Sequence, residues 1–365
     1  FTPDGKLLVS GTGGTAVAHV WDVTSGQKVA TFNKHDNVVV AAAISPDGIL
    51  LASAGRDGTV KLWDASTGKQ LGTMRGHEDE IRAVAFAPDG RMFLTERPGR
   101  VRVVENGVLL AAPALTLDDV RAVGEGGLLG IALHPDFAAN RFVYLLYTAN
   151  GPNGPVNRLV RYREVNNSLA ERAVLVDGIG AQNIHDGGRI RFGPDGRLYL
   201  TMGDAAEPAR SQALASLNGK ILRLTDTGAA APGNPFTSEV WSWGHRNPQG
   251  LDWHPVTGDL WASEHGQTAN DELNLIRAGV NYGWPVIEGG ATRPDMEAPK
   301  LFFPPPSVAP SGLSFYSATR MPGLRHDIFF ATLAGRHIHR VRLDPLDATR
   351  IVGTERLLDG VFGRI

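Results

Sequence analysis

The chain contains no cysteine. A disulfide framework and a metal site built on thiolates are therefore excluded. The sequence also lacks an excess of charge of either sign, because 36 basic and 38 acidic residues leave a formal net charge of −2. This balance gives no indication of a nucleic-acid partner or of attraction to an anionic membrane surface.

Long apolar runs are missing as well. The longest, such as Val38–Ile44, are far too short to span a bilayer. No signal peptide is visible, but the chain begins with Phe1 inside a repeat, so a leader removed earlier remains an open alternative. If the chain is a natural one, we expect a periplasmic or secreted location.

Turn residues and short repeats are abundant instead. Each repeat is a short apolar or alternating run, a tight turn and a second run, at a spacing of 42 to 61 residues. That period suits four-stranded blades. The turns begin with Pro-Asp-Gly at Pro3, Pro46, Pro88 and Pro194, and with related sequences at Pro135 and His254.

Helical patterns are few. Only residues 211–217 and 271–277 suggest amphipathic helices, whereas a parallel βαβ fold needs a helix between strands. We therefore predict an all-β fold, a β-propeller of seven four-stranded blades closed by both termini.

The first two repeats, TAVAHVWDVTSGQKVATFNKH and TVKLWDASTGKQLGTMRGH, resemble the WD-repeat family. In that family His, Ser or Thr, Asp and Trp form a buried hydrogen-bonded network, and the resemblance assigns these roles to His35, Ser53, Asp57 and Trp63. A metal or catalytic site is the functional alternative for the same residues. The resemblance covers about residues 1–80 and implies a scaffold.

The stretch 241–285 gathers polar groups that turn formation does not need. Gly, Asn and Pro are ordinary turn residues, but Arg246, Asn247, His265, Asp271 and Glu272 fall within it as well. We interpret the stretch as a rigid loop surface that holds an anionic group and a hard cation.

From about residue 81 to 365 the chain resembles the soluble glucose/sorbosone dehydrogenases that use pyrroloquinoline quinone, especially the aldose sugar dehydrogenases. That family has a six-bladed propeller with the quinone on one face, near the axis. The resemblance rests on eight segments in one order: LTERPGRVRVV, GEGGLLGIALHPDF, IHDGGRIRFGPDGRLYLTMGD, LNGKILRLTDTG, GHRNPQGL, SEHG with DELN, NYGWP and PSGLSFY.

The resemblance places the catalytic base at His185, within His-Asp-Gly-Gly-Arg. Neutral imidazole suits proton removal from a sugar hydroxyl near neutral pH, although a histidine in a turn is the alternative. Gly187 and Gly188 would allow close approach of backbone and cofactor. Asp204 would orient the histidine, or it is a structural turn residue.

The resemblance also implies the quinone contacts. Arg246 and Asn247 would bind the carboxylates and carbonyls of the quinone, as guanidinium and amide groups can. Glu125 lies where relatives have Gln near the quinone; because a carboxylate would repel the quinone, ordering of the loop is its alternative role. Arg364 matches an arginine contact of the last blade.

Two calcium sites are implied in the same way. Main-chain carbonyls of Gly266 and Gln267 would hold the catalytic calcium, which accepts oxygen ligands in flexible geometry. The family usually has Pro where Gln267 stands. Glu272 and the carbonyl of Tyr282 would hold a second, structural calcium, with a solvated turn acid as the alternative for Glu272.

The resemblance fails at the C-terminal end. The chain stops at Ile365, so the second arginine of the last blade is absent, and Ala334 stands where a lysine is frequent. We expect residues 361–365 to supply one strand of the blade that Phe1 continues, which would eliminate an open sheet edge.

Three hypotheses follow. The first is a calcium- and quinone-dependent dehydrogenase that oxidises aldose sugars to lactones and passes electrons to an acceptor. The second is a non-catalytic hybrid propeller with weakened or lost cofactor binding. The third is a calcium-dependent lactone hydrolase, which requires carboxylates that converge on one ion, with these as candidates: Glu125, Asp204, Glu264 and Asp271.

Overall fold

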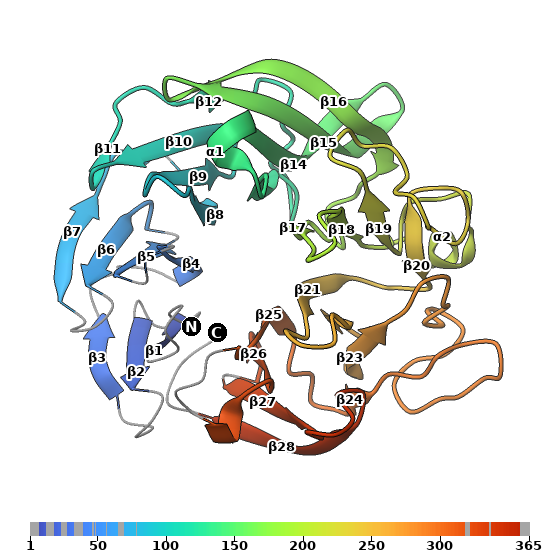
Figure 1. The fold of residues 1–365 in the computed structure, drawn as a ribbon. Coiled ribbons are helices and arrows are strands. Elements are labelled where there is room, and N and C mark those ends of the chain that lie inside the picture. Colours follow the sequence, from blue (N-terminus) through green and yellow to red (C-terminus); the bar gives the residue numbers. More distant parts are fainter. Residues whose placement is uncertain are drawn as a thin grey trace.

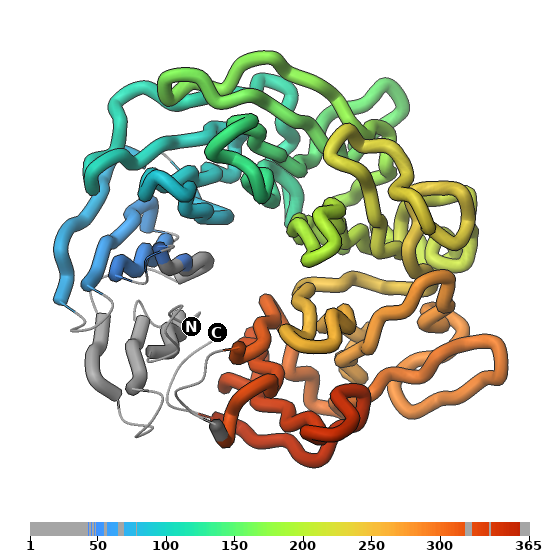
Figure 2. The backbone as a smooth tube through the Cα atoms, viewed as in Figure 1, coloured from blue at the N-terminus to red at the C-terminus, as the bar shows by residue number. Residues whose placement is uncertain are grey.

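The computed structural model describes residues 7–11, 18–22, 28–32, 39–45, 47, 49–55, 57–64, 69–77, 79–317, 322–335 and 337–357. Within them, 28 strands form seven sheets arranged around one axis (Figures 1 and 2). The prediction of an all-β propeller is confirmed.

The N-terminal part of the ring contains two sheets. One has the three strands β1 (Leu7–Gly11), β2 (Ala18–Asp22) and β3 (Lys28–Phe32). The next has β4 (Val39–Ile44), β5 (Leu50–Gly55), β6 (Val60–Asp64) and β7 (Gln70–Met74).

Two larger sheets follow. The first has β8 (Ile81–Phe86), β9 (Met92–Glu96) and β10 (Arg100–Glu105), with two short outer strands on β10, β11 (Val108–Leu109) and β12 (Leu115–Thr116). The second has β13 (Leu128–Leu133), β14 (Phe142–Gly151), β15 (Gly154–Val165) and β16 (Ser168–Gly180).

Three four-stranded sheets complete the described ring. They are β17 (Ile190–Phe192), β18 (Leu198–Met202), β19 (Lys220–Leu224) and β20 (Val240–Trp243); β21 (Pro248–Trp253), β22 (Leu260–Glu264), β23 (Asp271–Ile276) and β24 (Leu301–Phe303); and β25 (Pro310–Phe315), β26 (Ile328–Thr332), β27 (Ile338–Leu343) and β28 (Ile351–Leu357).

The predicted number of seven four-stranded blades is wrong. Six sheets are four-stranded blades, with β11 and β12 together as the outer strand of one, and the sheet β1–β3 has three strands in the described residues. The strand expected to complete it, residues 361–365, lies outside the described part of the chain.

The predicted helices are also mostly wrong. Residues 271–276 form strand β23, and the segment 211–217 is helical only where it overlaps α2 (Ala209–Gln212). The other helical elements are α1 (Phe137–Asn140) and the 3-10 turn η1 (Pro322–Leu324). Both described α-helices have four residues, and the described chain has no helix of the length and apolar character that a membrane crossing requires.

The hydrophobic core is divided among the interfaces between neighbouring blades. Phe93 and Val103 of one blade pack with Val143 and Val160 of the next, and similar clusters join the later blades. Because both faces of the middle strands are covered, β9, β18, β22 and β23 are buried at every residue.

The Pro-Asp-Gly turns have a simple cause. In the turn after β8, the carboxylate of Asp89 accepts the backbone N–H of Arg91 at 3.2 Å, and Gly90 adopts a positive φ of 87°. Asp195 and Gly196 repeat this arrangement after β17. An aspartate that closes the turn and a glycine that tolerates left-handed backbone are what such a turn requires.

Strand direction places the loops. Neighbouring strands in all seven sheets are antiparallel. In each four-stranded blade the connection after the second strand and the connection to the next blade therefore lie at one edge of the ring. The connections after the first and third strands lie at the other edge.

The WD-type network is present in part. The indole N–H of Trp63 donates to the hydroxyl of Ser53 at 2.9 Å, and Asp57 accepts the N–H of Thr59 at 2.9 Å. His35, the remaining predicted member, lies outside the described residues.

A buried charge cluster joins the WD-type part to the rest. His77, which follows β7, contacts the fully buried carboxylate of Glu96 at 2.7 Å. Arg100 and Arg102 donate to the same carboxylate at 2.6 and 3.2 Å. Burial alone would raise the pKa of Glu96, but its hydrogen bond to His77 and the charges of His77 and Arg100 lower the pKa below its usual value.

We expect Glu96→Ala to reduce the free energy of unfolding by about 3–5 kcal/mol, because it leaves the buried guanidinium of Arg102 without its carboxylate. Denaturant unfolding measures the change. Glu297→Ala, which removes an exposed partner of Lys300, is the control and should cost less than about 1 kcal/mol. Equal effects of the two substitutions would contradict a stabilising role for the cluster.

Candidate active site

The predicted site residues come together at one edge of the ring. His185 lies between β16 and β17, and Arg246 lies between β20 and β21, so both belong to connections between blades. Asp204 and Gly266 follow the second strands β18 and β22. The antiparallel order of the strands brings all four loops to the same edge.

His185 and Asp204 form a close pair. The Nδ1 atom of His185 lies 2.8 Å from Oδ1 of Asp204, whose side chain is fully buried, whereas the imidazole keeps 14% of its surface exposed. Because an ionised carboxylate can only accept, Nδ1 carries the proton. The other ring nitrogen, Nε2, makes no hydrogen bond to any described residue and is available as a base.

Close backbone packing holds this histidine. His185 has a positive φ of 62°, and its backbone N–H donates to the carboxylate of Glu125 at 2.7 Å. A Cβ atom on Gly203 would collide with the carbonyl oxygen of His185, and one on Gly187 would collide with that of Thr201. Such strained backbone persists only where its surroundings fix it. Glu125 therefore orders the loop, and its carboxylate is directed to the histidine backbone.

The neighbouring Asp186 is a buried acid with one unsatisfied oxygen. Its Oδ1 accepts from the side chain of Asn157 at 3.3 Å and from the N–H of Gln182 at 3.1 Å, whereas Oδ2 is buried without a partner among the described residues. Burial raises the pKa of Asp186 to about 6.

Arg246 presents a guanidinium with free hydrogen-bonding capacity. Its Nη1 donates to the carbonyl of His265 at 3.3 Å, and its Cζ lies 5.4 Å from the ring centroid of Trp284. The Nε atom is buried and has no partner in the described part of the chain. A buried, unpaired donor on a cation indicates an anionic ligand.

Asn247 is almost completely buried. Its Oδ1 accepts from the N–H of Gly187 at 3.2 Å and from the side chain of Gln249 at 3.0 Å. Its own N–H donates to Glu264 at 3.2 Å. These bonds connect the loop of Arg246 to the loop of His185.

The loop after β22 is compact and exposes two carbonyl groups. Asp271 accepts the N–H of Gly266 at 3.1 Å, and Glu288 accepts the N–H of Gln267 at 2.6 Å. The carbonyl oxygens of Gly266 and Gln267 accept no hydrogen bond from a described residue. His265 is anchored to the carbonyl of Pro310 at 2.8 Å, and burial lowers its pKa.

Two buried carboxylates face each other behind this loop. Glu264 on β22 pairs in register with Glu272 on β23. Glu264 contacts Nδ1 of His245 at 2.9 Å and accepts the backbone N–H of Arg246, whereas Glu272 accepts the N–H of Gly289 at 3.0 Å. Burial, followed by the negative charge of Glu264, raises the pKa of Glu272. Either a proton or a cation would relieve this repulsion.

The carboxylates of the lactone-hydrolase hypothesis do not converge. Glu125 accepts from His185, Asp204 from the imidazole and Glu264 from residues 246 and 247, whereas Asp271 accepts the N–H groups of residues 308 and 309 at 2.8 Å. Within the described residues, no group of three or more His, Asp or Glu side chains is arranged to hold a metal ion.

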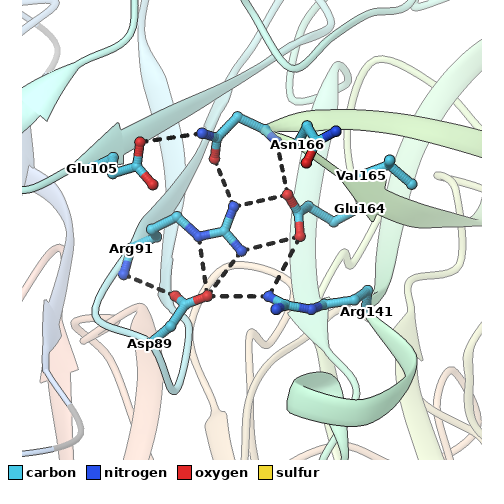
Figure 3. A pocket seen from close by; sticks show the side chains of 8 residues that line it. Asp89, Arg91, Glu105, Arg141, Glu164, Val165 and Asn166 are labelled. Atoms are coloured by element: carbon cyan, nitrogen blue, oxygen red, sulfur yellow. Dashed lines mark hydrogen bonds and ion pairs between the residues drawn. The ribbon is translucent and has the colours of Figure 1, made fainter.

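A separate pocket of about 480 Å³ lies at the other edge of the ring (Figure 3). Its charged side chains are already paired: Arg91 contacts Glu164 at 2.8 Å and Asp89 at 2.9 Å, and Arg141 contacts Asp89 at 3.2 Å. The pocket is lined by an ion-pair network between two blades. It lies at the edge of the ring opposite to the loop of His185.

Comparison with known proteins agrees with this geometry. Residues 78–365 match the family model described as Glucose / Sorbosone dehydrogenase. The chain belongs to the glucose/sorbosone dehydrogenase family. Residues 26–64 match the model described as WD domain, G-beta repeat. Both predicted resemblances are confirmed.

Three relatives of this glucose/sorbosone dehydrogenase family member illustrate the similarity. The aldose sugar dehydrogenase YliI of Escherichia coli is 33% identical over 68% of this chain and 73% of its own length. Quinoprotein glucose dehydrogenase B of Acinetobacter calcoaceticus is 34% identical over 54% of this chain and 48% of its own length. The PQQ-bound aldose sugar dehydrogenase of Streptomyces coelicolor is 35% identical, with a TM-score of 0.68 over 78% of this chain and 83% of that structure.

Of the remaining family positions, the structure describes Ala334 and Tyr282. Arg364 is outside the described residues. Ala334, which stands where the family often has lysine, is exposed, and its N–H donates to the carbonyl of Val308 at 3.0 Å. The ring of Tyr282 stacks on His245 at 4.9 Å, and its hydroxyl donates to Leu275 at 2.5 Å.

Sequence reasoning assigned no role to three residues that contact this site. Trp284 lies within the motif Asn-Tyr-Gly-Trp-Pro, and Asp186 lies within His-Asp-Gly-Gly-Arg. Neither motif indicates which residue the tryptophan or the aspartate contacts, because those residues are distant in the sequence. Glu288 carried no signal, because its partner is a backbone N–H 21 residues away in the sequence.

We expect the stability of Asp186→Asn relative to the parent to depend on pH. A raised pKa means that ionisation of Asp186 destabilises the fold. The parent should therefore lose up to about 3 kcal/mol relative to the variant as pH rises from about 4 through 6. Denaturant unfolding at several pH values measures this difference.

Asp177→Asn provides a control of opposite sign. The hydrogen bond from Arg158 lowers the pKa of Asp177, so the parent should gain stability relative to that variant as pH rises. A pH-independent difference for Asp186→Asn would contradict the buried, uncompensated state of this acid.

Proposed function

We propose that the protein is a quinoprotein that oxidises aldose sugars to lactones, with pyrroloquinoline quinone and calcium as cofactors. The observation that carries this proposal is the juxtaposition of a paired histidine base and an arginine with an unsatisfied buried donor. Membership of the glucose/sorbosone dehydrogenase family supports it, as does the quinone bound to the Streptomyces coelicolor relative.

The residues present fit these cofactors. The free Nε donor of Arg246 suits a carboxylate or carbonyl oxygen of the quinone. The unused carbonyl oxygens of Gly266 and Gln267 are hard ligands of the kind that calcium accepts. Glu272, whose ionised form is disfavoured by burial, and the carbonyl of Tyr282 suit a second cation.

The protein groups divide the work as follows. Asp204 holds the imidazole of His185 with Nδ1 protonated, so Nε2 can remove the proton of the anomeric hydroxyl. Arg246 stabilises negative charge that develops beside it. When bound, the quinone supplies the hydride acceptor and calcium the Lewis acid. An external acceptor would then take up the electrons. We propose a periplasmic or secreted location for the protein.

Reconstitution tests the proposal. The protein is incubated with pyrroloquinoline quinone and Ca²⁺, and reduction of a redox dye is followed with a set of aldoses. We expect sugar-dependent dye reduction, and a loss of about 10²–10⁴-fold in kcat for His185→Ala, the range that a positioned general base contributes.

The matched control is His134→Ala. His134 lies after β13 at the other edge of the ring, where its Nδ1 accepts the N–H of Asp136 at 3.0 Å. This variant should keep the activity of the parent. Activity of His185→Ala equal to that of the parent would refute the assignment, and so would the absence of dye reduction with every aldose tested.

Absorbance titration with the quinone decides between this proposal and a non-catalytic propeller. Ala334, which stands where the family often has lysine, favours weakened binding, whereas the free donor of Arg246 favours retention. We expect saturable binding in the presence of Ca²⁺ that is weakened by Arg246→Ala. No saturation at any quinone concentration would support the non-catalytic alternative.

We further expect Glu288→Ala to weaken calcium binding by about tenfold, the lower end for a residue that orients a ligand. The carboxylate of Glu288 holds the N–H of Gln267, a donor that proline would lack, and so fixes the loop of the two carbonyl ligands. Calorimetric titration of the protein with Ca²⁺ measures the affinity. Asp295→Ala, which removes an exposed acid paired with Arg293, should leave it unchanged; equal losses would contradict the role of Glu288.

A further inference from the structure

Asp204 uses both of its carboxylate oxygens. Oδ1 lies 2.8 Å from Nδ1 of His185 and accepts the N–H of Ala206 at 2.8 Å. Oδ2 accepts the indole N–H of Trp284 at 2.9 Å. The bond to Trp284 joins residues 80 positions apart in the sequence, and within the described residues it is the hydrogen bond that engages the second oxygen.

Trp284 is itself held rigidly. Its side chain is largely buried, with 9% of the residue exposed. Its backbone N–H donates to the carbonyl of Gly244 at 2.9 Å, and its carbonyl accepts from the side chain of Gln212 at 2.7 Å. The backbone of Trp284 is therefore held by two neighbouring segments, and the largely buried indole extends from this anchored backbone to the carboxylate of Asp204.

The same indole also supports the arginine. The guanidinium of Arg246 lies over the ring of Trp284, with 5.4 Å between Cζ and the ring centroid, a distance at which cation and ring attract. One side chain thus contacts the carboxylate behind the base and the cation beside it. The positions of the Asp204 carboxylate and the Arg246 guanidinium are therefore both tied to the position of the Trp284 ring.

We propose that Trp284 is a positioning residue of the active site. Its N–H fixes the rotation of the Asp204 carboxylate, which holds His185 with the proton on Nδ1 and leaves Nε2 unprotonated. Its ring sets the position of the Arg246 guanidinium. This inference rests on the proposed function in one respect, namely that His185 acts as the base.

The alternative role for Trp284 is packing alone, and Trp284→Phe separates the two roles. Phenylalanine keeps an aromatic ring under Arg246 and removes the donor to Asp204. Trp63→Phe is the matched control, because it removes a buried indole N–H bond of the same length, to Ser53, within the WD-type blade. Thermal unfolding and circular dichroism establish that each variant is folded.

The first measurement uses the protein without cofactor. Selective ¹⁵N labelling of histidine reports which ring nitrogen carries the proton, and the signals of His185 are assigned with His185→Ala. In the parent and in Trp63→Phe we expect the Nδ1–H tautomer. In Trp284→Phe we expect a mixture of tautomers, because the carboxylate that selects Nδ1–H is free to rotate.

The second measurement uses the reconstituted enzyme. We expect Trp284→Phe to lower kcat about tenfold, a part of the contribution of a positioned base, with KM changed less than about twofold. The acid limb of the pH–activity profile should move to higher pH, since a carboxylate that has lost a donor stabilises the positive charge of the protonated imidazole more strongly. This attraction between charges, unlike the choice of tautomer, does not need a fixed orientation of the carboxylate. Trp63→Phe should leave kcat and the pH profile unchanged.

A second variant tests the same bond from the other side. Asp204→Asn leaves Trp284 in place, and the indole N–H signal of Trp284, assigned in the parent by triple-resonance spectra, should shift when the charged acceptor is removed. An unshifted signal overturns the proposal even if Trp284→Phe does not fold. An unchanged His185 tautomer in a folded Trp284→Phe overturns it as well.

The outcomes separate this inference from the proposed function. If the parent oxidises no aldose but the tautomer changes in Trp284→Phe, the positioning role stands and the proposed reaction fails. If the parent is active and Trp284→Phe matches Trp63→Phe in kcat, pH profile and tautomer, the reaction stands and the positioning role fails.

Discussion

The even number of strands in the four-stranded blades that carry the site is the constraint on which this site depends. In a four-stranded antiparallel meander the chain leaves the outer strand at the edge where it entered the inner one. Every connection between blades therefore returns to the same edge, together with the loop after each second strand. His185, Asp204, Arg246 and Gly266 derive from four separate loops, yet they share one face because of this count.

Within that face, backbone contacts do most of the positioning. Gly203 and Gly187 have no room for a side chain because the loops that carry His185 and Asp204 pack backbone against backbone. The carboxylates of Glu125 and Asp271 accept backbone N–H groups. Several acids of the site therefore have a structural role, and the polar density seen in the sequence overstates the number of groups that can meet a ligand.

The sequence predicted the propeller and the main site residues for physical reasons. The Pro-Asp-Gly turns are a local sequence pattern, and their repetition predicts the blades. The motifs shared with the dehydrogenases, which occur in one order, indicate which loops carry the site residues. The number of strands in each sheet was not predictable from the repeats, because outer strands such as β11 and β12 are two residues long and carry no periodicity. Residues 271–277 suggest a helix in the sequence because a strand buried on both faces, as β23 is, shows no alternation of apolar and polar residues. The bonds of Trp284 and Glu288 were hidden because each joins distant segments.

The join between the two sequence types shows why such a ring can form at all. Blades contact one another through apolar faces, which tolerate varied side chains as long as volume and patterning are kept. A polar contact is made at the join as well: the buried imidazole of His77, which belongs to the WD-type part, lies 2.7 Å from a carboxylate. Glu96, from the segment that resembles the dehydrogenases, meets this requirement and also binds Arg100 and Arg102. One carboxylate thus receives contacts from both parts at their boundary, although Nε2 of His77 and Nε of Arg102 stay buried without a partner in the described part of the chain. The blades that carry His185 and Arg246 can then keep their mutual arrangement, whatever sequence type completes the ring.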